Sequence, residues 1–170
     1  MLAKHPFALS MVALALIAPS AAPARAEDAP HSAGQNVAEM KFVEFPGLPP
    51  CTTGAVLNGD PGKGSSIILA KVKSGCVIPW HWHTPNEHLM LVSGSARAEM
   101  KDGPSITLKA GGFALMPTKH VHRFTCTSSC LMYIYSDAAF DIHYVDAGGQ
   151  EIPPDEALKA KAPAAAKKKK

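Results

Sequence analysis

The sequence predicts an all-β domain, an antiparallel sandwich or barrel, and two observations favour it. Between residues 40 and 152, short runs rich in β-branched and large apolar residues follow one another closely, and glycine, proline and aspartate separate them. No stretch of this region carries the apolar spacing of an amphipathic helix. We therefore expect strands joined by short turns.

The turn signals divide this region into strands. Ser93-Gly94-Ser95 connects two runs that form a hairpin, Asp102-Gly103 is typical of a tight turn, and Pro117 ends a strand. An extended segment also carries His81 and His83. The other expected strands are residues 66–73, 87–92, 96–101, 106–109, 113–116, 121–126, 131–136 and 140–145.

The N-terminus has the features of a secretory signal peptide over residues 1–26. Lys4 provides a basic start, residues 7–18 are apolar, and Ala24-Arg25-Ala26 is a cleavage site of the A-x-A type. The alternative is a retained membrane anchor, but the apolar stretch is short for a bilayer span. We expect a periplasmic or secreted protein without integral membrane association.

Composition sets the remaining boundaries. Residues 27–39 are polar and residues 153–170 are rich in lysine and alanine, so we expect the first to be a polar segment and the second a disordered tail. The domain over residues 40–152 holds nine basic and nine acidic residues and is neutral, so the net charge of +3 arises mainly from the tail. The basic residues are not interleaved with aromatic ones, which argues against a nucleic-acid partner. The four terminal lysines could instead contact anionic lipid.

Four cysteines follow the expected cleavage site, and an even number in an exported chain favours disulfides. Cys126 and Cys130 flank a three-residue turn between two strands, which favours their pairing and leaves Cys51 to pair with Cys76. A thiolate metal site would need C-x-x-C pairs that the chain lacks. A redox-active Cys126/Cys130 pair is the other alternative.

Metal-ligating residue types gather in one segment. His81 and His83 are two residues apart, so an extended strand presents them on one face. Thr84-Pro85-Asn86 then turns the chain and brings Glu87 back beside them. His122 follows on a later strand. Three imidazoles and one carboxylate form a ligand set for a first-row divalent metal.

These residues resemble the motifs of the cupins. Gly75, His81, His83, Glu87 and Gly94 match every fixed position of the first cupin motif, G-x5-H-x-H-x3/4-E-x6-G. In the second motif, G-x5-P-x-G-x2-H-x3-N, three positions match and two differ: Gly111, Pro117 and His122 match, Lys119 replaces the glycine and Cys126 the asparagine. The resemblance implies a double-stranded β-helix, or jelly-roll barrel, over residues 40–152.

The resemblance also implies that His81, His83, Glu87 and His122 bind the metal. Iron, manganese, nickel, copper and zinc all suit this set. His120 is a rival for the place of His122, or orients a ligand from outside the coordination shell. Glu87 is the one candidate for an acid or base, and the other catalytic residues are unknown.

Alternation predicts which side chains line the interior. With His81, His83 and Glu87 inward, Trp80, Trp82, His88 and Met90 point outward, where a second sheet or the other subunit of a homodimer would cover them. We expect His31, His88 and His143 to be surface or hydrogen-bonded residues. Phe113, Leu115 and Phe124 are candidates for apolar walls around the metal.

The sequence therefore predicts an exported metal-binding cupin that acts on a small molecule. Dioxygenase chemistry is the first choice because the ligand set resembles quercetinase-like sites, and isomerase or lyase chemistry comes next. The alternatives are a non-catalytic periplasmic protein that binds or senses a metal or ligand, and a barrel without metal.

Overall fold

The computed structural model describes residues 33–159. The expected signal peptide, His31 and the rest of residues 27–32 of the polar segment, and the last eleven residues lie outside this range.

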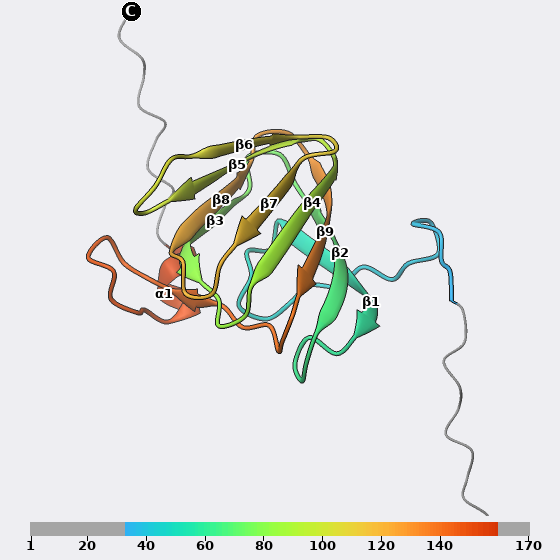
Figure 1. Cartoon of the computed structure of the whole chain (residues 1–170), viewed down its shortest axis with the longest axis horizontal. Coiled ribbons are helices and arrows are strands. Elements are labelled where there is room, and N and C mark those ends of the chain that lie inside the picture. Colours follow the sequence, from blue (N-terminus) through green and yellow to red (C-terminus); the bar gives the residue numbers. More distant parts are fainter. Residues whose placement is uncertain (1–32, 160–170) are drawn as a thin grey trace, which may run out of the picture. The chain divides into compact units, whose positions relative to one another are not determined.

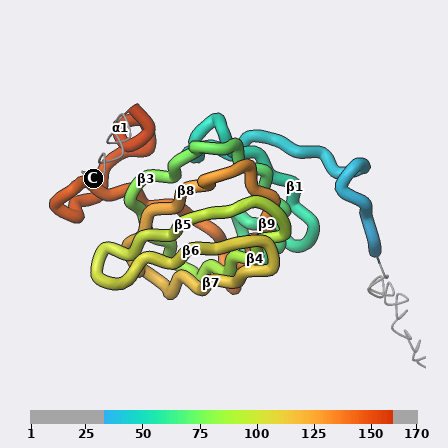
Figure 2. Tube along the Cα trace, turned by 90° about the horizontal axis from the view of Figure 1, so that it is seen from above, coloured from blue at the N-terminus to red at the C-terminus, as the bar shows by residue number. Residues whose placement is uncertain are grey.

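Ten strands and one helix make up the described chain. The strands form two five-stranded sheets with the orders β1-β2-β9-β4-β7 and β10-β3-β8-β5-β6, and every pair within them is antiparallel. Strands β3, β8, β5 and β6 lie in succession in Figure 2. The elements are β1 (Thr52–Gly59), β2 (Ser66–Val72), β3 (Val77–Trp82), β4 (Glu87–Ser93), β5 (Ser95–Met100), β6 (Ile106–Lys109), β7 (Phe113–Met116), β8 (His122–Cys126), β9 (Cys130–Ser136), β10 (His143–Tyr144) and α1 (Pro154–Lys159) (Figure 1).

The expected all-β class is therefore confirmed, and the alternation of side chains explains the core. Strand β4 buries Leu89 and Leu91, and strand β5 of the other sheet buries Ala96 and Ala98. The hairpin expected between these two strands is therefore wrong, because they lie in different sheets. These residues belong to one apolar cluster that also contains Phe124, as expected for an interior wall. The small alanines leave room for the larger side chains that face them, which is how close packing is reached between two sheets.

Two of the expected apolar walls are wrong. Phe113 and Leu115 are 58% and 43% exposed, whereas Ala114 and Met116 between them are buried. The register of β7 explains this, because Met116 pairs with Glu87 and Ala114 with Leu89, and paired residues share a face. A shift of one residue sends every side chain to the other face of the sheet.

Two elements were not expected. Strand β1 reads Thr-Thr-Gly-Ala-Val-Leu-Asn-Gly, which has no clear alternation, and a bulge interrupts its pairing with β2 between Val56 and Asn58. Helix α1 lies in the segment expected to be disordered, so that expectation is wrong for residues 154–159. Asp155 and Glu156 favour its first turn, Lys159 favours its last turn, and Ala157 is buried.

Both expected disulfides are confirmed. Cys51 pairs with Cys76, and Cys126 pairs with Cys130 across the turn between β8 and β9. Among residues 33–159, no helix has the length and apolar character needed to cross a membrane.

Candidate metal centre

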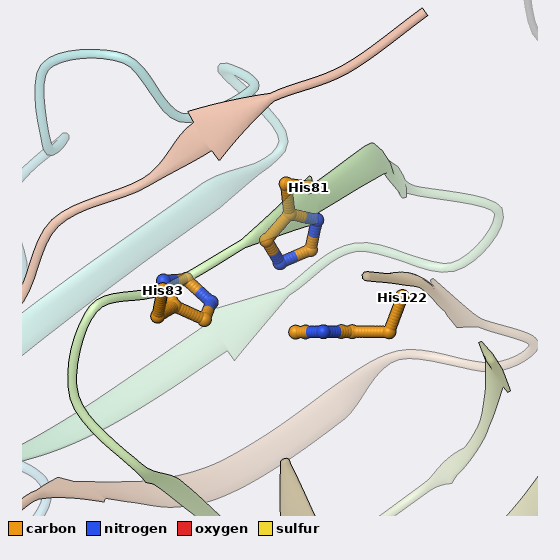
Figure 3. A group of neighbouring side chains, drawn as sticks. All are labelled: His81, His83 and His122. Atoms are coloured by element: carbon orange, nitrogen blue, oxygen red, sulfur yellow. The ribbon is translucent and has the colours of Figure 1, made fainter. Parts of the chain in front are cut away.

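Three histidines from neighbouring strands meet inside the domain. His81 lies in β3, His122 begins β8, and the two residues are paired across these strands. His83 directly follows β3. One ring nitrogen from each histidine lies within 4.8 Å of the others, and all three side chains are buried (Figure 3). The structure thus assembles three of the four residues expected to bind the metal into a group able to hold an ion.

Backbone carbonyls fix the orientation of all three rings. His81 Nδ1 bonds the carbonyl oxygen of Pro79 at 2.6 Å, and His122 Nδ1 bonds that of His120 at 2.8 Å. His83 Nδ1 bonds the carbonyl oxygen of Asp141. A carbonyl can only accept, so each Nδ1 carries the proton and each Nε2 keeps a free lone pair. Nε2 of His83 is buried and has no hydrogen-bond partner. Buried nitrogens are usually hydrogen-bonded, so this atom is suited to bind a metal ion.

Glu87 approaches two of the three histidines from the opposite sheet. Its carboxylate Oε2 lies 3.6 Å from His83 Nε2 and 3.5 Å from His122 Nε2. Burial alone would raise the pKa of Glu87, but His83 and His122 outweigh burial and the pKa lies below its ordinary value. The carboxylate is therefore ionised at neutral pH. One carboxylate beside two of three clustered imidazoles is a donor set that suits a divalent first-row metal.

The electrostatics of the site keep two of the histidine rings neutral. Burial lowers the pKa of His81 well below 6.5, and the neighbouring His122 and His83 lower it further. Burial likewise lowers the pKa of His83, although the carboxylate of Glu87 opposes that effect. Both rings are therefore neutral at pH 7, the form that binds metals.

These shifts predict how the stability of the metal-free protein depends on pH. Unfolding returns the two pKa values to about 6.5, so the unfolded chain binds more protons below that pH, and the free energy of unfolding falls as the pH falls. The slope is at most about 1.4 kcal/mol per pH unit for each histidine. Urea unfolding in the presence of a chelator at pH 7.5 and 5.5 measures the change. His81→Gln should reduce it, and a stability that stays level or rises toward pH 5.5 would contradict the expectation.

His120 does not compete with His122. Its side chain is not part of the histidine group, and only its backbone carbonyl contributes, by holding the ring of His122. His122 faces inward as the first residue of β8, whereas His120 lies in the turn before that strand. The rival expectation required the strand to begin two residues earlier.

The turn before β8 forms although lysine replaces the glycine of the second cupin motif. Lys119 adopts a left-handed backbone conformation with φ of 58°, and its N–H donates to the carbonyl of His83 at 2.8 Å. This bond ties the turn to the segment that carries a candidate ligand. Lys119 therefore pays a conformational cost that glycine would avoid.

The variant pair Lys119→Gly and Lys119→Ala isolates this cost. Both lose the ammonium group, which lies 5.9 Å from the ring of Trp82, but only glycine adopts the left-handed conformation without strain. We expect the glycine variant to be more stable than the alanine variant by about 1 kcal/mol in urea unfolding. An alanine variant of equal or greater stability would show that the turn is not strained.

Two residues that no sequence motif selects, Phe140 and Asp141, also contact the histidine group. The ring of Phe140 stacks on His83 with 4.4 Å between ring centres. Asp141 holds His83 through its carbonyl, and its carboxylate accepts bonds from the Thr84 N–H and from His143. Both precede β10, which pairs with β3, so only the long-range pairing of these strands brings them here. No local sequence motif predicts such a contact.

The outer face of β3 is covered partly by the chain itself. Trp82 stacks on His143 at 3.9 Å, and Trp80 lies beside Arg123 at 5.1 Å. His88 is half-buried between Phe113 and Tyr135, away from the histidine group. His88 and His143 are thus outside the centre, as the alternation indicates.

Comparison with known proteins agrees with this description. A model of the family described as "Cupin domain" matches residues 68–135, a range that contains His81, His83, Glu87 and His122. No curated protein matches the chain.

Several solved structures share the fold. An RmlC-like cupin protein from Ralstonia eutropha JMP134 has a TM-score of 0.58 at 19% identity, over 75% of this chain and 85% of that one. The polyketide cyclase RemF from Streptomyces resistomycificus has a TM-score of 0.58 at 17% identity, over 75% of this chain and 99% of the cyclase. The DMSP lyase DddQ from Ruegeria pomeroyi DSS-3 has a TM-score of 0.51 at 16% identity, over 59% of this chain and 57% of the lyase.

At these identities the neighbours show the fold alone, and this chain spans little more than half of the lyase. Their differing names indicate that the fold does not select one reaction. The family match, the two antiparallel sheets and the group of three histidines able to bind a metal together support the cupin superfamily for this chain.

Proposed function

We propose that this protein binds one divalent metal ion through His81, His83, His122 and Glu87 and acts there on a small molecule. The observation that carries the proposal is the shared arrangement of the three imidazoles, each held at Nδ1 by a carbonyl and free at Nε2. The ionised carboxylate of Glu87 supplies the fourth donor atom. Four protein donors leave coordination positions open on a metal that accepts six.

The expected signal peptide and the disulfides support a proposal about the cell compartment. We propose that residues 1–26 direct export and that the mature protein acts in the periplasm or outside the cell. All four cysteines are paired in disulfides, which persist in oxidising compartments. Mass spectrometry of the protein isolated from its own cells tests this, with a mature N-terminus expected near Glu27.

For the reaction, we propose a metal-dependent oxidation of the dioxygenase type. The metal would act as Lewis acid and activate oxygen. The chain itself keeps His81 and His83 neutral and buries all four proposed ligands. Among the described residues, the carboxylate of Glu87 lies 3.6 Å from His83 Nε2 and 3.5 Å from His122 Nε2, and it could move a proton only when it does not bind the metal.

One observation favours a second candidate, a non-catalytic protein that binds or senses a metal or ligand. Tyr144 packs near His81, with 6.0 Å between ring centres, but its hydroxyl donates to the carbonyl of Gly47 and burial raises its pKa. It therefore cannot serve as a base. Asp141 holds His83 through its backbone carbonyl, and its carboxylate is already bonded to Thr84 and His143.

Oxygen consumption separates the two candidates. Protein loaded in turn with iron, manganese, nickel or copper is offered diols, flavonols and diketones in an oxygen electrode. Turnover that is lost in His122→Ala supports the dioxygenase, with His88→Ala as the control that keeps it. Full metal loading without turnover on any of these substrates would favour the binding protein.

We also propose a homodimer. The outer face of β4 and β7 exposes Met90, Val92, Phe113 and Leu115, and an apolar patch of this kind is typical of a subunit contact. Sedimentation of the wild type and of Phe113→Lys tests the proposal. We expect a dimer for the first and a monomer for the second, and a wild-type monomer at micromolar concentration would exclude it.

A further inference from the structure

An apolar pocket lies beside the histidine group. Its volume is about 290 Å³, and it is lined by the N-terminal segment before β1, by inward residues of β2 and β9, and by the segment before β10. The residues that the argument uses are Phe45, Ile68, Ala70, Ile134, Phe140 and Asp141. The lining of this pocket contains none of the four proposed metal ligands.

One aromatic ring separates the pocket from the centre. Phe140 lines the pocket and stacks on His83, and the next residue, Asp141, lines the pocket and holds His83 Nδ1 through its carbonyl. Strand β9 provides a second connection. Its inward residue Ile134 lines the pocket, and Ser136, two positions further on the same face, pairs with Glu87.

The lining determines which molecules fit. Asp141 is the only charged residue in it, and its carboxylate is already bonded to Thr84 and His143. No lysine or arginine lines the pocket, so an anion would find no partner there. A cavity of about 150 Å³ lined by aliphatic and aromatic side chains is enough to bind benzene. A pocket nearly twice that volume has room for a substituted ring.

We infer that this pocket holds the neutral, apolar body of the substrate, while its polar end faces the metal centre across the edge of Phe140. The inference deepens the proposed function and rests on it, because it assigns a substrate class to the same centre. The substrate is then an uncharged molecule with an oxygen-bearing polar end and a branched alkyl or aromatic group at the other end.

Alkylphenols test the pocket without metal. On the full mature chain stripped by a chelator, calorimetry compares phenol with 4-tert-butylphenol and with the anion 4-tert-butylbenzoate. The buried alkyl group is expected to strengthen binding at least about tenfold over phenol. The benzoate is expected to bind at least about tenfold more weakly than the tert-butylphenol, since its charge has no partner. Equal binding of phenol and 4-tert-butylphenol would overturn the inference.

Two adjacent isoleucines provide the matched variants. Ile68 faces the pocket, and Ile67 lies on the opposite face of β2 and is 37% exposed. Ile68→Phe should fill the pocket, so that 4-tert-butylphenol and phenol bind with affinities that differ by no more than about twofold. Ile67→Phe should keep the preference for 4-tert-butylphenol over phenol. If Ile68→Phe does not fold, Ile68→Ala replaces it and should shift the preference toward 4-tert-octylphenol. Equal loss of the preference in the Ile67 and Ile68 variants would contradict a site in this pocket.

Catechols link the pocket to the metal. On protein loaded with redox-inert Zn²⁺, 4-tert-butylcatechol should bind at least about tenfold more tightly than catechol, and Ile68→Phe should again remove the difference. A preference seen with phenols on the stripped protein but absent with catechols on the zinc form would refute the link to the centre. If Zn²⁺ itself fails to bind, the proposed function fails. The phenol titrations on the stripped protein still test whether the pocket binds an apolar group.

Discussion

Replacing His81 or His122 by alanine is expected to lower the affinity for a divalent metal by at least about 100-fold, because changes to residues that merely orient a ligand already cost 10- to 100-fold. Each variant removes one Nε2 donor from a buried group whose members lie within 4.8 Å of one another. Calorimetric titration of the stripped protein with Zn²⁺ measures the loss. The wild type should bind one ion per chain with release of few protons at pH 7.5, because His81 and His83 are already neutral.

His88→Ala is the matched control. His88 is one position from Glu87 on β4 and points to the other face, between Phe113 and Tyr135. The same substitution there should leave the affinity within about twofold of the wild type. A loss in His88→Ala as large as in His81→Ala would mean that the substitutions act through the fold and not through the ligands.

Removing the Cys51–Cys76 disulfide is expected to cost about 3.5 kcal/mol of unfolding free energy, and removing Cys126–Cys130 about 2 kcal/mol. The difference follows from the closed loops, since the first bridge joins residues 25 apart and the second joins residues 4 apart. A longer loop gives the unfolded chain more freedom, which its bridge removes. Urea unfolding of the double variants Cys51→Ala/Cys76→Ala and Cys126→Ala/Cys130→Ala provides the measurement.

Each double variant is the control for the other, because both replace two largely buried sulfur atoms by methyl groups. The order of the two losses is therefore more informative than either value. A larger loss for the Cys126/Cys130 pair would indicate that packing between β8 and β9, and not loop closure, determines what these bridges contribute.

Local signals predicted most of the sheet. Strands flanked by glycine, proline or aspartate appear close to their expected bounds, as in β6 and β7, because these residues restrict the backbone within a few positions of themselves. Strand β1 lacked alternation and was missed, because a bulge and pairing with β2 determine its conformation. Helix α1 was missed because six residues of ordinary helical composition give no signal without the buried contact of Ala157.

In the candidate centre too, local signals predicted some residues, whereas others depend on long-range strand pairing. His81 and His83 share a face through strand periodicity, and the motif spacing placed Glu87 and His122 with them. The side of the sheet on which Phe113 and Leu115 lie depends on the register between β4 and β7, which the sequence of β7 alone does not determine. The contacts of Phe140 and Asp141 with His83 arise from chain segments more than fifty residues apart. Such contacts follow from topology and not from local pattern.

The most direct test of the metal centre is X-ray absorption spectroscopy at the zinc edge on the protein loaded with one equivalent of Zn²⁺. The arrangement of three carbonyl-anchored imidazoles and one ionised carboxylate predicts three imidazole nitrogens at about 2.0–2.1 Å and a carboxylate oxygen at about 2.0–2.2 Å from the zinc. The multiple scattering of imidazole rings identifies the nitrogen ligands. A first shell with fewer than three imidazoles, or one that contains sulfur, would contradict the assignment of His81, His83 and His122 as the metal ligands.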